Sequence, residues 1–141
     1  MIGIRFGSIH TYDDWKLLLA QKQIGLPKVK TTKVEVPGVD GILDLTEALT
    51  GSVCYGNREL SFTFIALDAL SGMTWAELLT RISAAIHGKK MDIVLDDDPE
   101  WKYTGRVTID SFETSRAKRT VVIKCDCDPY KTSLTDGSKS L

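Results

Sequence analysis

The sequence lacks any long run of apolar residues. No stretch reaches the roughly 18 consecutive apolar residues that a membrane-spanning helix needs, so no transmembrane helix is expected. Residues 1–5 lack a basic end followed by an apolar stretch and a small-residue cleavage site, so no signal peptide is expected either. Folding in a cytoplasm is therefore the expectation.

Cysteine and histidine are both scarce. The three cysteines, Cys54, Cys125 and Cys127, are too few and too oddly numbered for a disulfide framework, so reduced thiols are expected. Nucleophilic catalysis needs a base, and the chain has two histidines. We interpret His10 as a solvated loop residue and His87 as an imidazolium at the end of a helix. The sequence therefore predicts no catalytic residues and no enzyme.

Charge of one sign is not in excess. The 141 residues include 18 basic and 19 acidic side chains, which gives a formal net charge of -1. Such a chain has no general electrostatic attraction to nucleic acid or anionic lipid. With 43% hydrophobic and 26% charged residues, the composition is that of a single soluble globular domain.

Two short motifs resemble metal sites without matching their spacing. Cys125 and Cys127 alternate with aspartates, but structural zinc needs four ligands, and Cys-x-Cys in a strand projects both sulfurs to one face. We interpret them as core residues. Asp96 to Asp98 lacks the spacing of a calcium-binding loop and is interpreted as a solvated hairpin tip. No metal and no cofactor is predicted.

One helix is predicted, from Trp75 to about His87, because apolar residues recur there at helical spacing. Thr74 and Glu77 form a capping pair at its start, and Gly88 supplies a positive-φ stop at its end.

Alternating apolar residues predict strands at 59–67, 91–95, 103–110 and 119–127, with the first of them inside the sheet. Residues 15–20 fit either a strand or a helical turn, and we favour a strand. Residues 30–36 should be extended up to Pro37. The sequence thus predicts an α+β fold: a mostly antiparallel β-sandwich with one flanking helix. Residues 1–131 form the predicted domain, and residues 132–141 a flexible polar tail.

A long connection separates two strand-like segments between residues 38 and 56. It is punctuated by glycine, yet it carries the apolar side chains of Ile42, Leu43, Leu45, Ala48 and Leu49. Such a loop must bury this surface, either against another subunit or against its own domain. The sequence leaves both possibilities open.

Pro37-Gly38-Val39-Asp40-Gly41, followed by Tyr55-Gly56-Asn57-Arg58, resembles the N-terminal domain of siphophage distal tail proteins, the hub components of the tail tip. The likeness covers nearly all of residues 1–131, through Phe6-Gly7, Tyr12 to Trp15, Lys28 to Val36, and Cys127 to Lys131. Many family members continue into a second, carbohydrate-binding-like domain, which the resemblance does not include. Sugar or receptor binding is therefore not carried over to this chain.

The resemblance implies a structural protein of a phage or prophage tail tip, placed in the virion tail after folding in the host cytoplasm. Family members form a ring, a hexamer, that joins the tail tube protein to baseplate or tail fibre proteins and leaves a channel for DNA. No membrane is involved. Asp96 to Asp98 is a candidate lining of that channel. The resemblance and the local sequence together suggest residues with architectural roles. These are Pro37, Gly38, Asp40 and Gly41 in the loop, Asp44 as a cap, and Tyr55, Asn57 and Arg58 beside the strand. We also expect Arg58 to pair with Asp40 or Asp44.

Three alternatives remain open at this point. The first is a small enzyme or metal-binding domain around Cys125 and Cys127. The second is a carbohydrate-type ligand-binding β-sandwich module in which Trp101 or Tyr103 stacks on a sugar. The third is another tail component, such as a tail tube or tail-completion protein.

Overall fold

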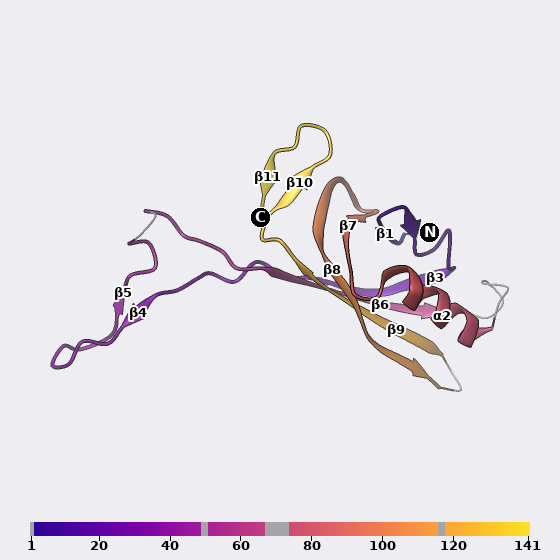
Figure 1. Ribbon diagram of the computed structural model, residues 1–141, viewed down its shortest axis with the longest axis horizontal. Helices are drawn as coiled ribbons and strands as arrows, with labels where there is room; N and C mark the ends of the chain where they lie inside the picture. Colours follow the sequence, from indigo (N-terminus) through magenta and orange to yellow (C-terminus); the bar gives the residue numbers. More distant parts are fainter. Residues whose placement is uncertain (1, 49–50, 67–73, 116–117) are drawn as a thin grey trace.

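The computed structural model describes residues 2–48, 51–66, 74–115 and 118–141. Its main sheet is antiparallel, with strand order β2-β1-β7-β8-β9-β6-β3, and β10 adds to β8 (Figure 1). The bounds are β1 Ile4–Phe6, β2 Ile9–His10, β3 Leu17–Ile24, β6 Arg58–Ala66, β7 Lys89–Leu95, β8 Asp98–Thr114, β9 Arg119–Cys127, β10 Lys131–Ser133 and β11 Lys139–Ser140. This arrangement confirms the predicted fold class and the strand assignment at residues 17–20.

The core lies on one face of this sheet. Along β6 every second side chain is buried, and the same holds for residues 121–127 of β9, which pairs with β6. Phe6 of β1 meets Phe62 of β6 edge to face, with ring centroids 6.1 Å apart. Burial of alternate side chains follows from the two-residue period of a strand.

Helix α2, Trp75–Ile86, buries Leu78, Ile82 and Ile86 in this core. The predicted start is confirmed, because Thr74 Oγ1 accepts a hydrogen bond from the backbone N–H of Glu77 at 3.2 Å. The predicted stop is also confirmed, since Gly88 has a φ of 79°.

His87 caps the C-terminus of the helix, but its charge was interpreted wrongly. Its Nδ1 accepts a hydrogen bond from the backbone N–H of Ile109 at 3.1 Å, which requires a ring nitrogen without a proton. Lys89 supplies the positive charge instead, because its Nζ donates to the Ala84 carbonyl at 2.9 Å. The imidazole therefore fastens the helix end to β8.

The prediction of a solvated His10 is also wrong. The residue is 5% exposed, and its Nδ1 accepts hydrogen bonds from the backbone N–H groups of Tyr12 and Asp13, at 3.2 and 3.1 Å. The proton therefore sits on Nε2, which donates to Asp96 Oδ2 at 2.7 Å. Gly3 N donates to the same oxygen at 2.8 Å. These bonds fix the N-terminal strands to the turn between β7 and β8.

The acidic turn at 96–98 is a solvent-exposed hairpin tip, as predicted, but its carboxylates also pair with other strands. Besides Asp96 with His10, Asp97 forms an ion pair with Lys22 of β3, and Asp98 Oδ2 lies 3.4 Å from Lys131 Nζ of β10. Each carboxylate thus has a partner from a different strand. This pairing could not be read from the sequence, because the partners lie far away along the chain.

Polar residues after 130 form a hairpin, whereas the sequence predicts a flexible tail from residue 132. Strand β10 pairs with β11 and also with β8, where Thr132 lies opposite Lys102. Leu134 N donates to the Glu100 carbonyl at 2.8 Å. Backbone pairing of this kind needs no apolar side chains, so composition gives no sign of it. The division of the chain at residue 131 stays a prediction.

Candidate functional site: the projecting arm

The described residues 26–48 and 51–57 form an arm that leaves the main sheet after β3 and returns at β6 (Figure 1). Its two strands carry the small sheet of β4, Lys33–Val34, and β5, Leu43–Asp44. Nearer the body, Lys30 N donates to the Cys54 carbonyl at 2.8 Å, and Gly56 N donates to the Lys28 carbonyl at 2.7 Å. The arm is thus a long, narrow, hydrogen-bonded hairpin.

Apolar side chains remain exposed along the arm. Ile42 is 61% exposed and Val39 63%, so the loop does not cover its apolar surface with its own domain. The sequence left open whether the loop packs against another subunit or folds back on its own domain. The described part of the loop does not fold back on its own domain. Most of the exposed large apolar side chains among the described residues lie here: Leu26, Val29, Val34, Val36, Val39, Ile42, Leu43 and Leu45. Leu49, also part of that expectation, lies outside the described residues.

The tip of the arm is shaped by proline and glycine. Val39 N donates to the Val36 carbonyl at 3.2 Å, which closes a four-residue turn with Pro37 and Gly38 in its centre. Gly38 has a φ of 83°, a conformation that glycine adopts without strain at the third position of a type II turn. Asp40 follows as an exposed residue. A shallow hollow at the tip is lined by Val36, Val39, Asp40, Gly41, Ile42 and Leu43.

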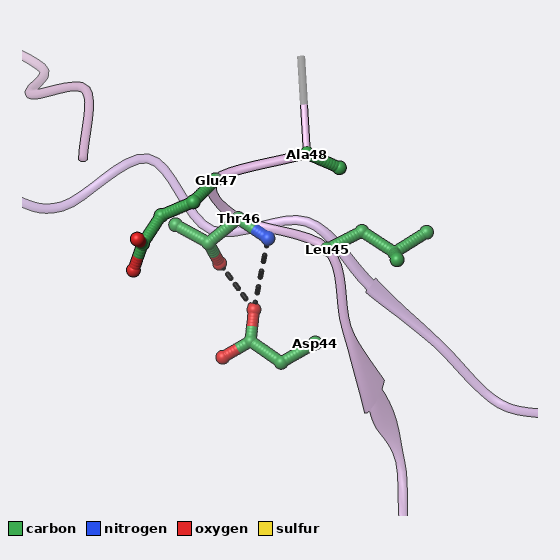
Figure 2. Close-up of a pocket in the computed structure, with 5 residues that line it drawn as sticks. All are labelled: Asp44, Leu45, Thr46, Glu47 and Ala48. Carbon is green, nitrogen blue, oxygen red and sulfur yellow. Dashed lines mark hydrogen bonds between the residues drawn. The ribbon is translucent and has the colours of Figure 1, made fainter. Parts of the chain in front are cut away.

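Asp44 caps the turn that follows β5 (Figure 2). Its Oδ1 accepts hydrogen bonds from the Thr46 hydroxyl and from Thr46 N, the latter at 3.0 Å. The side-chain bond and then the backbone bond hold the pKa of Asp44 below its usual value. This geometry agrees with the capping role expected for Asp44.

The predicted pairing of Arg58 with Asp40 or Asp44 is wrong. Arg58 begins β6 on the core face and is 3% exposed, whereas Asp44 belongs to β5 and Asp40 to the loop between β4 and β5, and both strands lie in the distal part of the arm (Figure 1). Its Nε donates to the Gly25 carbonyl at 2.9 Å, and its guanidinium carbon lies 5.2 Å from the centre of the Tyr103 ring. Within the described part of the chain, Nη1 is buried without a hydrogen-bond partner.

Tyr55 and Asn57 flank the return of the arm to the body. Tyr55 forms a β-bridge with Val29, and its ring meets Tyr130 edge to face, with centroids 6.1 Å apart. Asn57 is exposed between Gly56 and Arg58. The structure therefore brings Tyr55 and Arg58 to the arm root, while Pro37, Gly38, Asp40 and Gly41 lie at the tip. Tyr130 belongs to the segment Cys127 to Lys131 that carries the resemblance, but its contact with Tyr55 was not predicted, because it joins two separate segments.

Cys125 and Cys127 are poor ligands and nucleophiles. Burial, followed by the charges of Asp126 and Asp128, raises the pKa of Cys127 to about 12, and burial also raises the pKa of Cys125. Within the described ranges, no group of three or more His, Cys, Asp or Glu residues could hold a metal ion. These thiols pack as core residues, as expected.

The aromatic rings suggested for sugar stacking are already in contact with protein. Tyr103 is 4% exposed, and Lys131 Nζ lies 5.0 Å from the centre of the Trp101 ring. Tyr103 therefore does not match the exposed platform that the ligand-binding alternative requires, and Trp101 is half-buried.

Among the described residues, no helix has the length and apolar character needed to cross a membrane.

No known family model and no curated protein matches this sequence. Among solved structures, the chain is similar to the Dit protein of phage SPP1, described as a paradigm of the hub adsorption apparatus in phages that infect Gram-positive bacteria. The TM-score is 0.68 at 19% sequence identity, over 94% of this chain and 52% of that chain. The chain therefore spans about half the length of that protein and shares its fold over this span.

Proposed function

We propose that this protein is a structural component of a phage or prophage tail tip, assembled into a ring by its arm. The ring joins the tail tube protein to baseplate or tail fibre proteins and leaves a channel for DNA. The observation that carries the proposal is the arm itself, which extends from the body with its apolar side chains exposed. The fold shared with the phage hub protein supports the same function.

An exposed apolar surface of this kind is typical of a protein–protein contact. Burying one valine, leucine or isoleucine side chain contributes roughly 1.5–3 kcal/mol. Several such side chains together offset the association cost, which is on the order of 4–15 kcal/mol. The arm therefore carries enough apolar surface to hold two subunits together.

The contact we propose is heterologous, because the arm of one subunit meets a different surface on the next. A heterologous contact repeated around an axis closes into a ring when the rotation fits. The family resemblance favours six subunits. A subunit with a formal net charge of -1 gives DNA no general attraction to the channel wall.

Within this proposal, the roles of the arm residues are architectural. Pro37, Gly38 and Gly41 shape the tip that presents Asp40 and its apolar neighbours. At the root, Tyr55, Asn57 and Arg58 place the arm against β6. We assign no catalytic role to any residue.

The test compares two variants that carry charged substitutions. Ile42→Asp with Leu43→Asp places carboxylates at the arm tip, where the side chains are 61% and 53% exposed. Leu134→Asp is the matched control, because Leu134 is 51% exposed but lies on the C-terminal hairpin. We expect the arm variant to sediment as a monomer and the control to associate like the native chain, with unchanged melting temperatures. Equal association of both variants would contradict the proposal.

A further inference from the structure

The C-terminal hairpin of β10 and β11 lies beside the root of the arm (Figure 1). The contact between them joins two tyrosines: Tyr55 on the returning strand of the arm and Tyr130, directly before β10. Their rings are 6.1 Å apart at an interplanar angle of 88°, the edge-to-face geometry that aromatic pairs prefer.

The hairpin is fastened to the body on its other side. Lys131 Nζ lies 3.4 Å from Asp98 Oδ2 and 5.0 Å from the centre of the Trp101 ring. Ser133 is 8% exposed and lies opposite Trp101, and Leu134 N donates to the Glu100 carbonyl. Tyr130 is therefore held on the first residues of β8, a strand that pairs along its length with β7 and β9.

The hydrogen bonds inside the arm do not set its direction. The bonds from Lys30 N to the Cys54 carbonyl and from Gly56 N to the Lys28 carbonyl move with the arm when it turns at its root. Direction depends on contacts from the arm or its root to the body, such as the bond from Arg58 to Gly25 and the ring contact of Tyr55 with Tyr130.

A small rotation at the root has a large effect at the tip. About ten residues separate the root from the tip turn, which is roughly 30 Å at the rise of a strand, so a 10° rotation moves the tip by about 5 Å. Such a displacement exceeds the tolerance of a packed contact.

We propose that Tyr130 is a positioning residue for the arm. By contacting Tyr55 it transmits the position of the C-terminal hairpin to the arm and sets the angle at which the arm meets the next subunit. This inference rests on the proposed function of the arm in assembly. It also links two regions of the chain: displacement of the hairpin, for instance by a protein bound there, changes the direction of the arm.

The test measures the direction of the arm in single subunits. Spin labels are placed at Val39→Cys in the tip and Glu77→Cys on α2, with Cys54→Ser to remove the third accessible thiol. Ile42→Asp and Leu43→Asp keep the protein monomeric. Double electron–electron resonance then gives the distribution of distances between arm and body in the variants Tyr130→Ala, Tyr130→Phe and Leu134→Ala.

We expect Tyr130→Ala to widen this distribution at least twofold, whereas Tyr130→Phe, which keeps the ring, and Leu134→Ala leave it unchanged. Tyr55→Ala removes the other partner and should widen it equally. Protection of the Leu134 amide from hydrogen exchange shows that the hairpin is still seated in each variant. An unchanged width in both tyrosine-to-alanine variants would overturn the inference, and so would equal widening in Leu134→Ala. Because the labelled chains are monomers, this result is separate from the test of association.

Discussion

His10 Nε2 and Asp96 Oδ2 are 2.7 Å apart, although 86 residues separate them in the sequence. Together with Gly3 N, which donates to the same carboxylate oxygen, this bond closes the N-terminal strands onto the turn between β7 and β8. Burial alone would raise the pKa of Asp96, but the hydrogen bonds from His10 and Gly3 outweigh it and hold the pKa below its usual value.

This pKa shift makes the stability sensitive to acid. A carboxyl group whose pKa is lower in the folded state contributes stability above its unfolded pKa of about 3.9 and loses that contribution as the pH falls through the folded value. Asp96→Asn should cost about 1.5–3 kcal/mol at pH 7, the range for hydrogen bonds to a charged group. The difference from the native chain should shrink as the pH falls below about 3.9 and through the lower folded-state pKa, as measured by urea unfolding.

The control for this prediction is Asp97→Asn. Asp97 pairs with Lys22 at an exposed site, with 47% of its side chain accessible, and such pairs contribute about 0–1 kcal/mol. Equal losses in the two variants, or a loss at Asp96 that does not change with pH, would contradict the explanation.

Arg58 should tolerate methionine better than alanine. Its side chain fills space on the core face of β6, and alanine would leave a cavity that costs about 2–5 kcal/mol. Methionine keeps most of the volume and removes a buried guanidinium whose Nη1 has no partner among the described residues, so its cost should stay within about 1 kcal/mol. Chemical unfolding of both variants measures the difference. Equal destabilisation by methionine and alanine would contradict this prediction. It would mean that the hydrogen bond from Nε to the Gly25 carbonyl contributes more to the free energy of unfolding than the volume of the side chain does.

Gly105 should not accept a side chain. A Cβ there would lie 2.4 Å from the Asp126 carbonyl oxygen and 2.5 Å from the Cys127 Cα, so β8 and β9 would have to separate. We expect Gly105→Ala to destabilise the fold by about 1–3 kcal/mol in thermal unfolding. Gly56→Ala is the comparison, since its nearest contact would be the Lys28 carbonyl at 3.7 Å. Similar melting temperatures for the two variants would argue against a close approach of β8 and β9 at Gly105.

The thiols should differ in reactivity. Cys125 and Cys127 are buried with raised pKa values, whereas Cys54 is partly exposed at the arm root. A thiol reagent at pH 8 should therefore label one of the three cysteines in the folded chain and all three in denaturant. Rapid labelling of Cys125 or Cys127 under native conditions, detected by mass spectrometry, would disagree with their place in the core.

The strands and the helix could be predicted because their signals are local. The alternation in β6 and β9 and the capped apolar stripe of α2 follow from side-chain periodicity within a few residues. The turn at Pro37 and Gly38 could also be predicted, because proline and glycine have intrinsic backbone preferences that favour a turn.

What the sequence could not show depends on contacts between distant segments. The place of His10 depends on Asp96, and that of Tyr55 on Tyr130, and no local pattern encodes either pair. Arg58 illustrates the same point. Its place among the segments that carry the resemblance suggested an ion pair with Asp40 or Asp44, but the arm extends so that β5 and the loop before it lie away from its root (Figure 1).

The most direct test of assembly through the arm is the mass of the native chain in solution, measured by light scattering over a range of concentrations. A discrete multiple of the 15.6 kDa subunit, six in the ring we propose, is the expected result. Replacing residues 31–53 by a short turn should reduce that mass to a single subunit. A strict monomer at every concentration, or an oligomer that persists without the arm, would contradict the proposal.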